Sequence, residues 1–389
     1  MDKVKFGVIG IGNMGSSHTK FISELQNCVL TAVCDENPEA FKRMTAPDPD
    51  KVAKFTDAET FFKEADVDAV IIAVPHYAHP DLAIMAMQHG KHVIVEKPIA
   101  VHKKEAFRLL AEVEKHPELK CAAMFNQRTI PAHRKIKQLI DSGELGKITR
   151  INWIITDWFR SQYYYDSGDW RASWRGEGGG VLLNQCPHQL DLMQWFFGLP
   201  SSVRAITHFG KYHDIEVEDE VTAYLEYPNG ATGVFISTTG EAPGTNRLEI
   251  AGDRGKLVYE GGKLEFIRNE ELTSEFRANS KTAFGTPAIW NVSIPCEAGN
   301  PHMHRDIISN MADAIQKDVP LTAALPEGIR ALELGNAILL SGWQNGAEVT
   351  LPIDHEDYAA RLEKLAANSR YVKKTITGEI ATGNFGNSF

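Results

Sequence analysis

The sequence predicts an α/β fold in two parts: an N-terminal doubly wound parallel sheet, and a C-terminal α+β domain with a large, mostly antiparallel, open-faced sheet. Over residues 1–126, short apolar runs alternate with helical patterns, which is typical of a parallel sheet covered by helices. Beyond residue 126 the pattern changes to longer alternating strands joined by turn pairs such as Asn229-Gly230, which indicates antiparallel hairpins. The 389 residues are enough for two such domains.

The predicted elements of residues 1–126 follow one another through short links. The run 67–74 is the most hydrophobic of them and ends at Pro75, so it predicts a central strand buried on both faces. Asp57 is a suitable cap for one helix, and Gly90 ends another. Ligands of such a sheet bind at the carboxyl ends of the strands. The predicted strands are 4–9, 29–34, 67–74, 92–95 and 121–125, and the predicted helices are 16–25, 38–44, 57–64, 79–89 and 102–115.

Residues 127–375 are predicted to form the second domain. An amphipathic helix closed by Gly143 opens it, and helices with apolar residues at helical spacing follow its strands. The tail 376–389 is rich in Gly, Thr and Asn, and we expect it to be weakly ordered unless a partner subunit holds it. The predicted strands are 147–155, 203–209, 221–227, 232–238, 247–251, 256–259 and 348–351, and the predicted helices are 130–142, 302–317, 326–343 and 356–367.

Composition and charge exclude several classes of protein. Hydrophobic residues make up 43% and charged residues 24%, which is ordinary for a soluble protein, and a net charge of −10 without a Lys/Arg cluster argues against nucleic-acid binding. Five cysteines without a C-x-x-C pair predict reduced thiols instead of disulfides or zinc ligands. No apolar run approaches the roughly 18–20 residues that span a bilayer, and the histidines lack the carboxylate spacing of a metal site. We therefore expect a cytoplasmic protein with no metal, no membrane contact and no nucleic-acid partner.

The first strand passes at once into Gly10-Ile11-Gly12-Asn13-Met14-Gly15 and then into a helix. In a dinucleotide-binding domain of the Rossmann type, Gly10 would make the tight turn, Gly12 would let the backbone approach a pyrophosphate, and Gly15 would let helix and strand pack closely. Asp35 ends the second strand, where its carboxylate can accept hydrogen bonds from a ribose diol and would repel a 2′-phosphate. This arrangement predicts NAD, with NADP less favoured, over an ordinary glycine turn followed by a surface acid.

Other residues at the carboxyl ends of the strands are expected near the same cofactor. His76 follows the strand that ends at Val74-Pro75, so its place in the fold would put it near the nicotinamide, with no catalytic role assigned. The expected cofactor contacts are Gly10, Gly12, Asn13, Met14, Gly15, Asp35, Val74, Pro75, His76, His79, Glu96, Lys97 and Asn126.

Lys97 arrives on the loop after the strand 92–95, at the edge where a nicotinamide ring should lie. Its ammonium could donate a hydrogen bond to a substrate oxygen and stabilise the alkoxide as a hydride leaves. A lysine on the surface of the molecule is the alternative interpretation.

The stretch from Gly178 to Asp191 contains three glycines and then Asn184, Pro187 and His188. On a helix, Asn184, His188 and Asp191 would share one face, although Pro187 requires the helix to begin near Asn184 or to be kinked. His188 is the best candidate for a general base, because an imidazole can accept a hydroxyl proton at neutral pH. The alternative is a core histidine whose hydrogen-bonding capacity is satisfied by Asp191.

Aromatic and charged residues gather at 157–165 and 169–175. Rings that stack on the apolar faces of sugars, mixed with Arg and Asp that bind hydroxyls, are what a carbohydrate pocket needs. A subunit interface is enriched in the same residue types, and both interpretations stay open. The residues expected to bind substrate are Asn184, Trp170, Arg171, Trp174 and Tyr164.

The glycine turn, Glu96-Lys97-Pro98, the glycine-rich stretch with His188 and Asp191, and the sheet-rich second half together resemble the glucose-fructose oxidoreductase / inositol dehydrogenase / rhizopine-catabolism (Gfo/Idh/MocA) family. The resemblance implies that Lys97 and His188 are catalytic. It also implies a homodimer or homotetramer that packs through the open face of the second-domain sheet. The family commonly has Asp four residues before the histidine, where this chain has Asn184, so an amide here replaces a residue that could share a proton.

We therefore expect an NAD-dependent dehydrogenase that oxidises a secondary ring hydroxyl of a sugar, glycoside or cyclitol to a ketone. The long aromatic stretch favours a glycoside oxidised on its ring, at C3, over a free small polyol. Two alternatives remain. One is an enzyme that retains NAD and cleaves glycosidic bonds through transient oxidation. The other is a non-catalytic NAD or sugar sensor, which Asn184 makes conceivable and which the presence of both Lys97 and His188 argues against.

Overall fold

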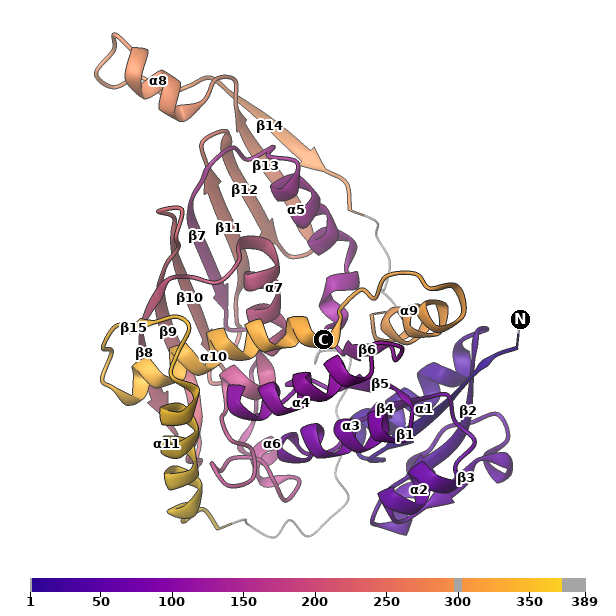
Figure 1. The fold of residues 1–389 in the computed structure, drawn as a ribbon. Helices are drawn as coiled ribbons and strands as arrows, with labels where there is room; N and C mark the ends of the chain where they lie inside the picture. The colour runs from indigo at the N-terminus through magenta and orange to yellow at the C-terminus, as the bar shows by residue number, and fades with distance from the viewer. Residues whose placement is uncertain (1, 297–302, 373–389) are drawn as a thin grey trace.

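The computed structural model describes residues 2–296 and 303–372, so the predicted tail 376–389 lies outside the described residues. Within the described part, the strands form one sheet of six and one sheet of nine. Figure 1 shows the smaller sheet and its helices beside the lower end of the larger sheet, whose far edge extends away from the body. The predicted fold class is confirmed.

The six-stranded sheet has the strand order β3-β2-β1-β4-β5-β6, and every adjacent pair in it is parallel. This is the doubly wound order, in which the direction of winding reverses between β1 and β4 and leaves a crevice at their carboxyl ends. β4 is buried along its whole length, as the apolar run predicts. The strands are β1 (Val4–Ile9), β2 (Cys28–Cys34), β3 (Ala53–Phe55), β4 (Ala69–Ile72), β5 (His92–Val95) and β6 (Cys121–Ala123).

The helices that cover this sheet lie close to their predicted positions. Asp57 caps α2 by accepting the N–H of Thr60 at 2.8 Å. The short strand β3 was not predicted from the sequence, since two of its three residues are exposed and leave no apolar pattern. The helical elements are α1 (Asn13–Glu24), η1 (Pro38–Arg43), η2 (Pro49–Lys51), α2 (Ala58–Glu64), η3 (His76–Ala78), α3 (His79–Gln88), α4 (Lys103–Lys115) and η4 (Asn126–Thr129).

Helix α9 (His304–Lys317) follows all but the last strand of the second sheet in the sequence but packs on the first sheet (Figure 1). Its residues Ile307, Ile308 and Met311 are buried in the cluster that contains Phe6 of β1 and Ile22 of α1. The chain therefore returns to complete the first unit. The domain boundary at residue 126 remains a prediction. The structure shows in addition that α9, from later in the chain, packs on the first unit.

The nine-stranded sheet has the order β14-β13-β12-β11-β7-β10-β9-β8-β15, and its pairs are antiparallel except for β7 and β10. The far edge, with β13, β14 and the short helix α8 (Thr273–Asn279), was not predicted. Five of the six residues of β14 are exposed, so no buried face produces an alternating pattern. The strands are β7 (Ile148–Ile155), β8 (Ser202–Phe209), β9 (Glu218–Glu226), β10 (Thr232–Thr238), β11 (Asn246–Gly252), β12 (Gly255–Glu260), β13 (Lys263–Asn269), β14 (Ile289–Ile294) and β15 (Val349–Thr350).

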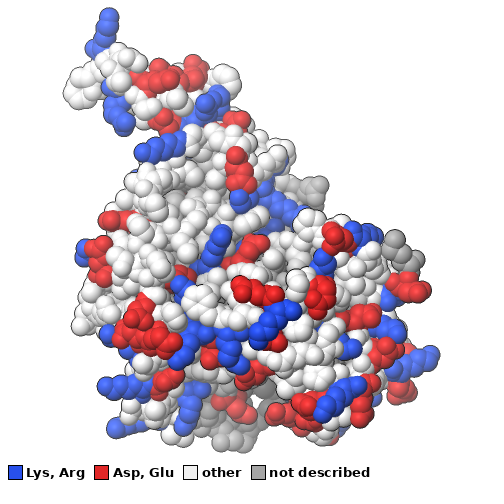
Figure 2. Space-filling model, in the orientation of Figure 1, with Lys and Arg blue, Asp and Glu red and all other residues white. Residues whose placement is uncertain are grey.

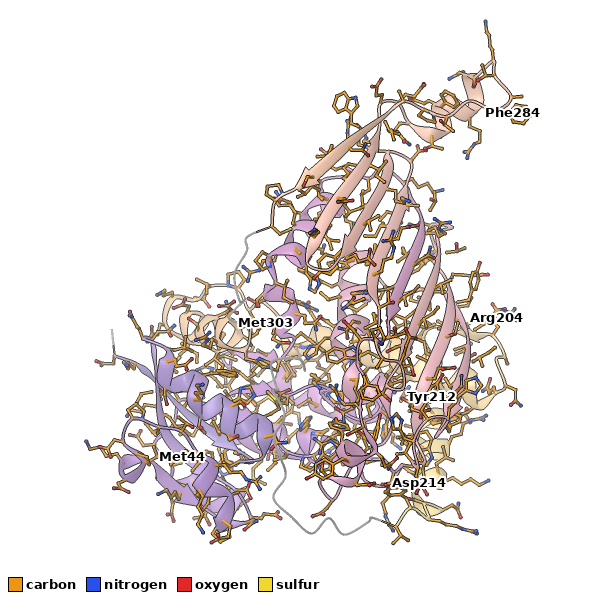
Figure 3. The ribbon with its side chains drawn as sticks, turned by 180° about the vertical axis from the view of Figure 1, so that it is seen from behind. Met44, Arg204, Tyr212, Asp214, Phe284 and Met303 are labelled. Carbon is orange, nitrogen blue, oxygen red and sulfur yellow. The ribbon has the colours of Figure 1, made fainter. Side chains whose placement is uncertain are left out.

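Helices cover only one face of the larger sheet, as Figures 1 and 3 show from opposite sides. Alternation along β8 buries Val203 and Ala205, whereas Ile206 on the other face is 62% exposed and Tyr224 of β9 is 41% exposed.

On the side of the molecule in Figure 2, acidic and basic groups are interspersed and form no basic stripe. The remaining helical elements are α5 (Pro131–Asp141), α6 (Gln162–Asp166), η5 (Val181–Gln185), α7 (Pro187–Phe197), η6 (Leu325–Glu327), α10 (Gly328–Trp343) and α11 (His355–Ala367).

Candidate active site

The glycine turn between β1 and α1 has the shape that a dinucleotide phosphate requires. A Cβ on Gly10, whose φ is +86°, would lie 2.5 Å from the carbonyl oxygen of Ala73, and one on Gly15 would lie 1.7 Å from the carbonyl oxygen of Gly10. A Cβ on Gly12 would meet nothing within 4 Å, so this position opens to the outside. The first turn of α1, which begins with Asn13 and Met14, has no acidic residue and no side-chain cap. Its free N–H groups suit an anion, so the residues present fit NAD.

Asp35 lies beside this turn, directly after β2. Its Oδ2 accepts the N–H of Ile11 at 2.7 Å, and its Oδ1 accepts the N–H of Asn37 at 2.9 Å. Each carboxylate oxygen keeps a further lone pair for a ligand hydroxyl. A fixed negative charge at this place suits a ribose diol and disfavours a ribose phosphate.

The loops after β4 and β5 are tied together by His79. Its Nδ1 lies 2.7 Å from the carbonyl oxygen of Pro98, and its Nε2 lies 2.8 Å from that of Val74, which precedes Pro75. The ring is buried, and burial lowers its pKa below 6.5. His79 thus holds the Lys97-Pro98 loop in place through backbone contacts, a role that the sequence did not indicate.

Glu96 is buried behind Lys97. Its carboxylate lies 2.7 Å from Nε2 of His18 on α1 and accepts the backbone N–H of Lys97 at 3.1 Å. Burial favours the protonated acid, but the bond to His18 and the nearby cations outweigh it and lower the pKa of Glu96 to about 2. The fully buried Asn126 places its amide nitrogen 3.1 Å from the ring of His304 in α9. His18 and His304 were missed, because no sequence spacing connects them to these partners.

Lys97 joins the two halves of the site. Its Nζ donates a hydrogen bond of 2.8 Å to the backbone carbonyl oxygen of Asn184, in the second unit. Burial lowers the pKa of Lys97 below 10.5, although the neighbouring Glu96 raises it. The arginines Arg160 and Arg171 are near enough to lower it further. The lysine is therefore enclosed in the site and is not a freely exposed surface cation.

The predicted helix around Asn184 and His188 is built as two pieces. A π turn (Val181–Gln185) carries Asn184, and α7 begins at Pro187, whose missing N–H costs nothing at a first helical position. His188 is 5% exposed, its ring lies edge-on to Phe125, and its Nδ1 has no partner among the described residues. Burial, followed by the charge of Lys97, holds the pKa of His188 well below 6.5, so the imidazole is neutral at neutral pH.

The predicted face shared by Asn184, His188 and Asp191 does not form. Asp191 makes a two-pronged ion pair with the buried Arg128, with N–O distances of 2.6 and 2.7 Å, and Arg128 also contacts Glu327. A buried guanidinium requires such a partner, and it holds Asp191 toward η4. Asp191 therefore anchors α7 and does not satisfy His188.

Asn184 turns its side chain toward the aromatic stretch. Its Nδ2 donates to Oε1 of Glu177 and to the hydroxyl oxygen of Tyr164, the latter at 3.2 Å. The guanidinium of Arg171 lies over the ring of Tyr164, 4.6 Å from its centroid. Glu177 was missed from the sequence, where only the glycines that follow it were noted.

Trp170 and Trp174 have different positions in the structure. The ring of Trp170 lies edge-on to that of His76, with centroids 4.7 Å apart, at the boundary between the two units. Trp174, which was expected among the substrate contacts, is only 7% exposed and packs against Phe209 and Trp343 in the core of the second unit. The structure thus brings Trp170, Arg171 and Tyr164 together, and the substrate contact of Trp174 stays a prediction.

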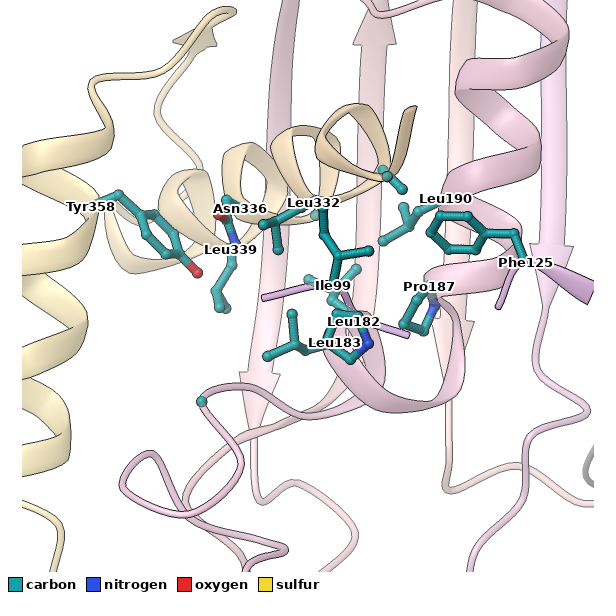
Figure 4. Close-up of a pocket in the computed structure, with 15 residues that line it drawn as sticks. Ile99, Phe125, Leu182, Leu183, Pro187, Leu190, Leu332, Asn336, Leu339 and Tyr358 are labelled. Atoms are coloured by element: carbon teal, nitrogen blue, oxygen red, sulfur yellow. The ribbon is translucent and has the colours of Figure 1, made fainter. Parts of the chain in front are cut away.

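A small apolar cavity lies between the π turn 181–185 and α10 (Figure 4). It is lined by Ile99, Leu182, Leu183, Pro187 and by residues of α10, whereas Lys97 and His188 do not line it. A lining with so few polar groups offers little to a hydroxylated ligand, so we assign no ligand to it.

Two other classes of site were searched for in residues 2–296 and 303–372. No group of three or more His, Cys, Asp or Glu side chains is placed there to hold a metal ion. None of the helices in these ranges is both long enough and apolar enough to cross a bilayer.

Two family models match the chain. One, described as an oxidoreductase family with an NAD-binding Rossmann fold, matches residues 4–123. The other, described as a GFO/IDH/MocA C-terminal domain, matches residues 133–258. Together the two matches extend over most of the described chain.

Proteins of similar sequence include a levoglucosan dehydrogenase from Pseudarthrobacter phenanthrenivorans, 25% identical over 75% of this chain and 80% of the relative. The scyllo-inositol 2-dehydrogenase (NAD(+)) of Bacillus subtilis is 26% identical over 70% of this chain and 76% of the relative. Among solved structures, the WlbA dehydrogenase of Bordetella pertussis, in complex with NADH and UDP-GlcNAcA, superimposes with a TM-score of 0.74 at 26% identity. That comparison covers 90% of this chain and all of the other.

Proposed function

Since the chain belongs to the GFO/IDH/MocA family of NAD-binding oxidoreductases, we propose that it oxidises a secondary ring hydroxyl of a sugar, glycoside or cyclitol to a ketone. The observation that carries the proposal is the contact of Lys97 Nζ with the backbone of Asn184, four residues before the neutral His188. The charge of Lys97 is near enough to lower the pKa of His188, which supports a shared role for the cation and the neutral imidazole. The two similar dehydrogenases act, by their names, on levoglucosan and an inositol, which supports this substrate class.

The chemistry divides between the two residues. NAD, which the glycine turn and Asp35 would hold, would supply the acceptor for the hydride that leaves the ring carbon. Lys97 donates a hydrogen bond to the substrate oxygen and stabilises the negative charge that develops there, an effect worth about 3–4 kcal/mol for one well-placed donor. His188, neutral and with its Nδ1 unpaired among the described residues, accepts the hydroxyl proton. Glu96 and His79 hold the backbone from which Lys97 projects.

Trp170 and Tyr164 supply aromatic rings on the substrate side of the site, and Arg171 lies against both of them. Such rings suit the apolar face of a pyranose, and the guanidinium suits its hydroxyls. This composition favours a glycoside oxidised on its ring, at C3, over a small polyol. A panel in which only inositols are turned over would contradict this refinement.

The experiment is to incubate the purified protein with NAD and a panel of cyclitols, aldoses and aryl glycosides. Reduced nicotinamide is followed by absorbance, and products are identified by mass spectrometry. A ketone formed with stoichiometric NADH supports the dehydrogenase. Release of aglycone without NADH supports the NAD-retaining glycosidase instead, and binding of NADH without any turnover supports a sensor.

A further inference from the structure

Glu177 lies between the aromatic stretch 157–175 and the π turn that carries Asn184, and it is fully buried. Its Oε1 accepts a hydrogen bond from Nδ2 of Asn184, and its Oε2 accepts the backbone N–H of Ala172 at 2.7 Å. Its backbone carbonyl lies 3.1 Å from Nδ1 of His76 in the first unit. One residue therefore connects three parts of the site.

The contact with Ala172 holds an unfavourable backbone conformation. Ala172 has a φ of +72°, a left-handed value that a residue with a Cβ rarely adopts. Such a conformation persists when surrounding contacts fix it. Glu177 provides one of these contacts, and the turn it fixes carries Arg171.

The contact with Asn184 determines which way the amide points. The NH₂ group of Asn184 donates one proton to the carboxyl oxygen of Glu177 and directs the other at the hydroxyl of Tyr164. No hydrogen bond from the described residues reaches the side-chain oxygen Oδ1. Oδ1 is therefore a hydrogen-bond acceptor on the same residue whose backbone oxygen accepts from Lys97.

Building on the proposed function, we infer that Glu177 is a positioning residue that orients the Asn184 amide to accept a hydrogen bond from a second substrate hydroxyl, next to the one oxidised. The resemblance to the family implies an aspartate at position 184. Here that aspartate would face the Glu177 carboxylate, and two carboxylates so close cannot both ionise. The acid at position 177 and the amide at position 184 are therefore matched, because an amide can donate a hydrogen bond to Glu177 and a carboxylate cannot.

The test is an exchange of acid and amide between the two positions. Asn184→Asp brings two carboxylates together. Glu177→Gln places two amide side chains against each other, and one of them must rotate and lose one of its hydrogen bonds. In the double variant, the introduced glutamine can accept from Ala172 and donate to the introduced aspartate, so the lost contacts return. We expect each single variant to lower kcat/KM at least about 30-fold, and the double variant to recover to within about 5-fold of wild type.

A neighbouring residue provides the matched control. Gln185 also donates to the hydroxyl of Tyr164, at 3.1 Å, whereas the side-chain contacts of Glu177 that carry the inference go to Asn184 and Ala172. Gln185→Glu should therefore not be rescued by Glu177→Gln. Equal rescue of both would show that the effect is general electrostatics and would overturn the inference.

Substrate selectivity gives a readout that a purely structural role would not change. Wild type should turn over the best sugar of the panel at least about 10-fold faster, in kcat/KM, than the analogue lacking the neighbouring hydroxyl. Glu177→Gln should reduce this ratio below about 3-fold, and the double variant should restore it. An unchanged ratio in Glu177→Gln would overturn the inference.

Thermal unfolding separates this inference from the proposed function. Asn184→Asp should lower the Tm by at least about 3 °C, and the double variant should regain most of that loss. If wild type turns over no sugar, the proposed function fails, and the unfolding cycle still decides the pairing. Non-additive Tm changes then support the pair, and additive ones refute it.

Discussion

The Nζ atom of Lys97 lies 2.8 Å from the backbone carbonyl oxygen of Asn184, and this hydrogen bond joins the two halves of the molecule at the candidate active site. The donor projects from the end of a strand in the parallel sheet, and the acceptor belongs to a π turn that packs against the larger sheet. An ammonium has three protons, so two remain for a substrate oxygen. The hydrogen bond to Asn184 therefore orients the lysine and leaves its ammonium able to bind a substrate oxygen.

Replacing Lys97 by methionine should remove turnover and leave the cofactor site intact. We expect kcat to fall by about 10²- to 10³-fold, since the stabilising charge at the substrate oxygen is lost. NADH affinity, measured by fluorescence titration, should stay within about 3-fold of wild type. A variant that keeps more than a tenth of the wild-type kcat would exclude Lys97 from the chemistry, whereas a sensor would keep its ligand response.

The glycine turn offers a matched pair of substitutions. Gly12→Ala adds a methyl group that meets nothing within 4 Å, so the fold should persist while NADH affinity falls at least about 10-fold through obstruction of the phosphate. Gly15→Ala places the methyl carbon 1.7 Å from the carbonyl oxygen of Gly10, so the protein should unfold at a much lower temperature or fail to fold. Equal Tm values for the two variants would contradict this account.

Asp35 should determine the choice of cofactor. Wild type should use NAD at least about 100-fold more efficiently than NADP, because the carboxylate repels a ribose phosphate. Asp35→Ser should reduce that ratio at least about 10-fold, measured as kcat/KM for each cofactor. Asp354→Ser, which removes the cap of α11 in the second unit, serves as the control. Faster turnover of NADP by wild type would disprove the role of Asp35.

His133 should make the protein less stable in acid. Burial lowers the pKa of this imidazole to about 4, against about 6.5 in an unfolded chain, so the unfolded state binds the extra proton. The stability that the neutral ring contributes is complete above about pH 6.5 and is lost as the pH falls toward about 4. In denaturant titrations, the free energy of unfolding should decrease between about pH 7 and pH 5, and His133→Gln should make this decrease smaller by about 2 kcal/mol. Substitution of the half-exposed His355 should not, and an equal effect there would contradict the prediction.

The open face of the nine-stranded sheet should mediate self-association. Ile206 and Tyr224 are exposed on this face, where the resemblance to the family places the contact between subunits. Ile206→Asp should convert a dimer or tetramer into smaller species, measured by size-exclusion chromatography with light scattering. Phe107→Ser, on the exposed side of α4, should leave the mass unchanged. A wild-type monomer at micromolar concentration would refute the proposal.

Local features of the fold could be predicted from the sequence, because each depends on residues close together in the chain. The glycine turn, the buried strands and the cap at Asp57 depend on sterics and on apolar alternation. The place of Lys97 followed from the rule that ligands bind at the carboxyl ends of parallel strands. The prediction that His188 acts together with Lys97 came from the resemblance to a known family.

The partners of buried charges could not be predicted in this way. Asp191 has His188 as a neighbour in sequence but pairs with Arg128, which is 63 residues away. Glu96 pairs with His18 across 78 residues. Which buried side chain meets which carboxylate depends on the tertiary path of the chain, and apolar periodicity does not encode that path.

The late position of α9 in the chain has a consequence for synthesis on the ribosome. Ile307, Ile308 and Met311 complete the core between α1 and β1, so the first unit keeps an uncovered apolar face until these residues have left the exit tunnel. By that point the strands of the second sheet up to β14 have already been made. The core of the nascent N-terminal half therefore stays partly exposed until a helix that is translated roughly two hundred residues later has been made.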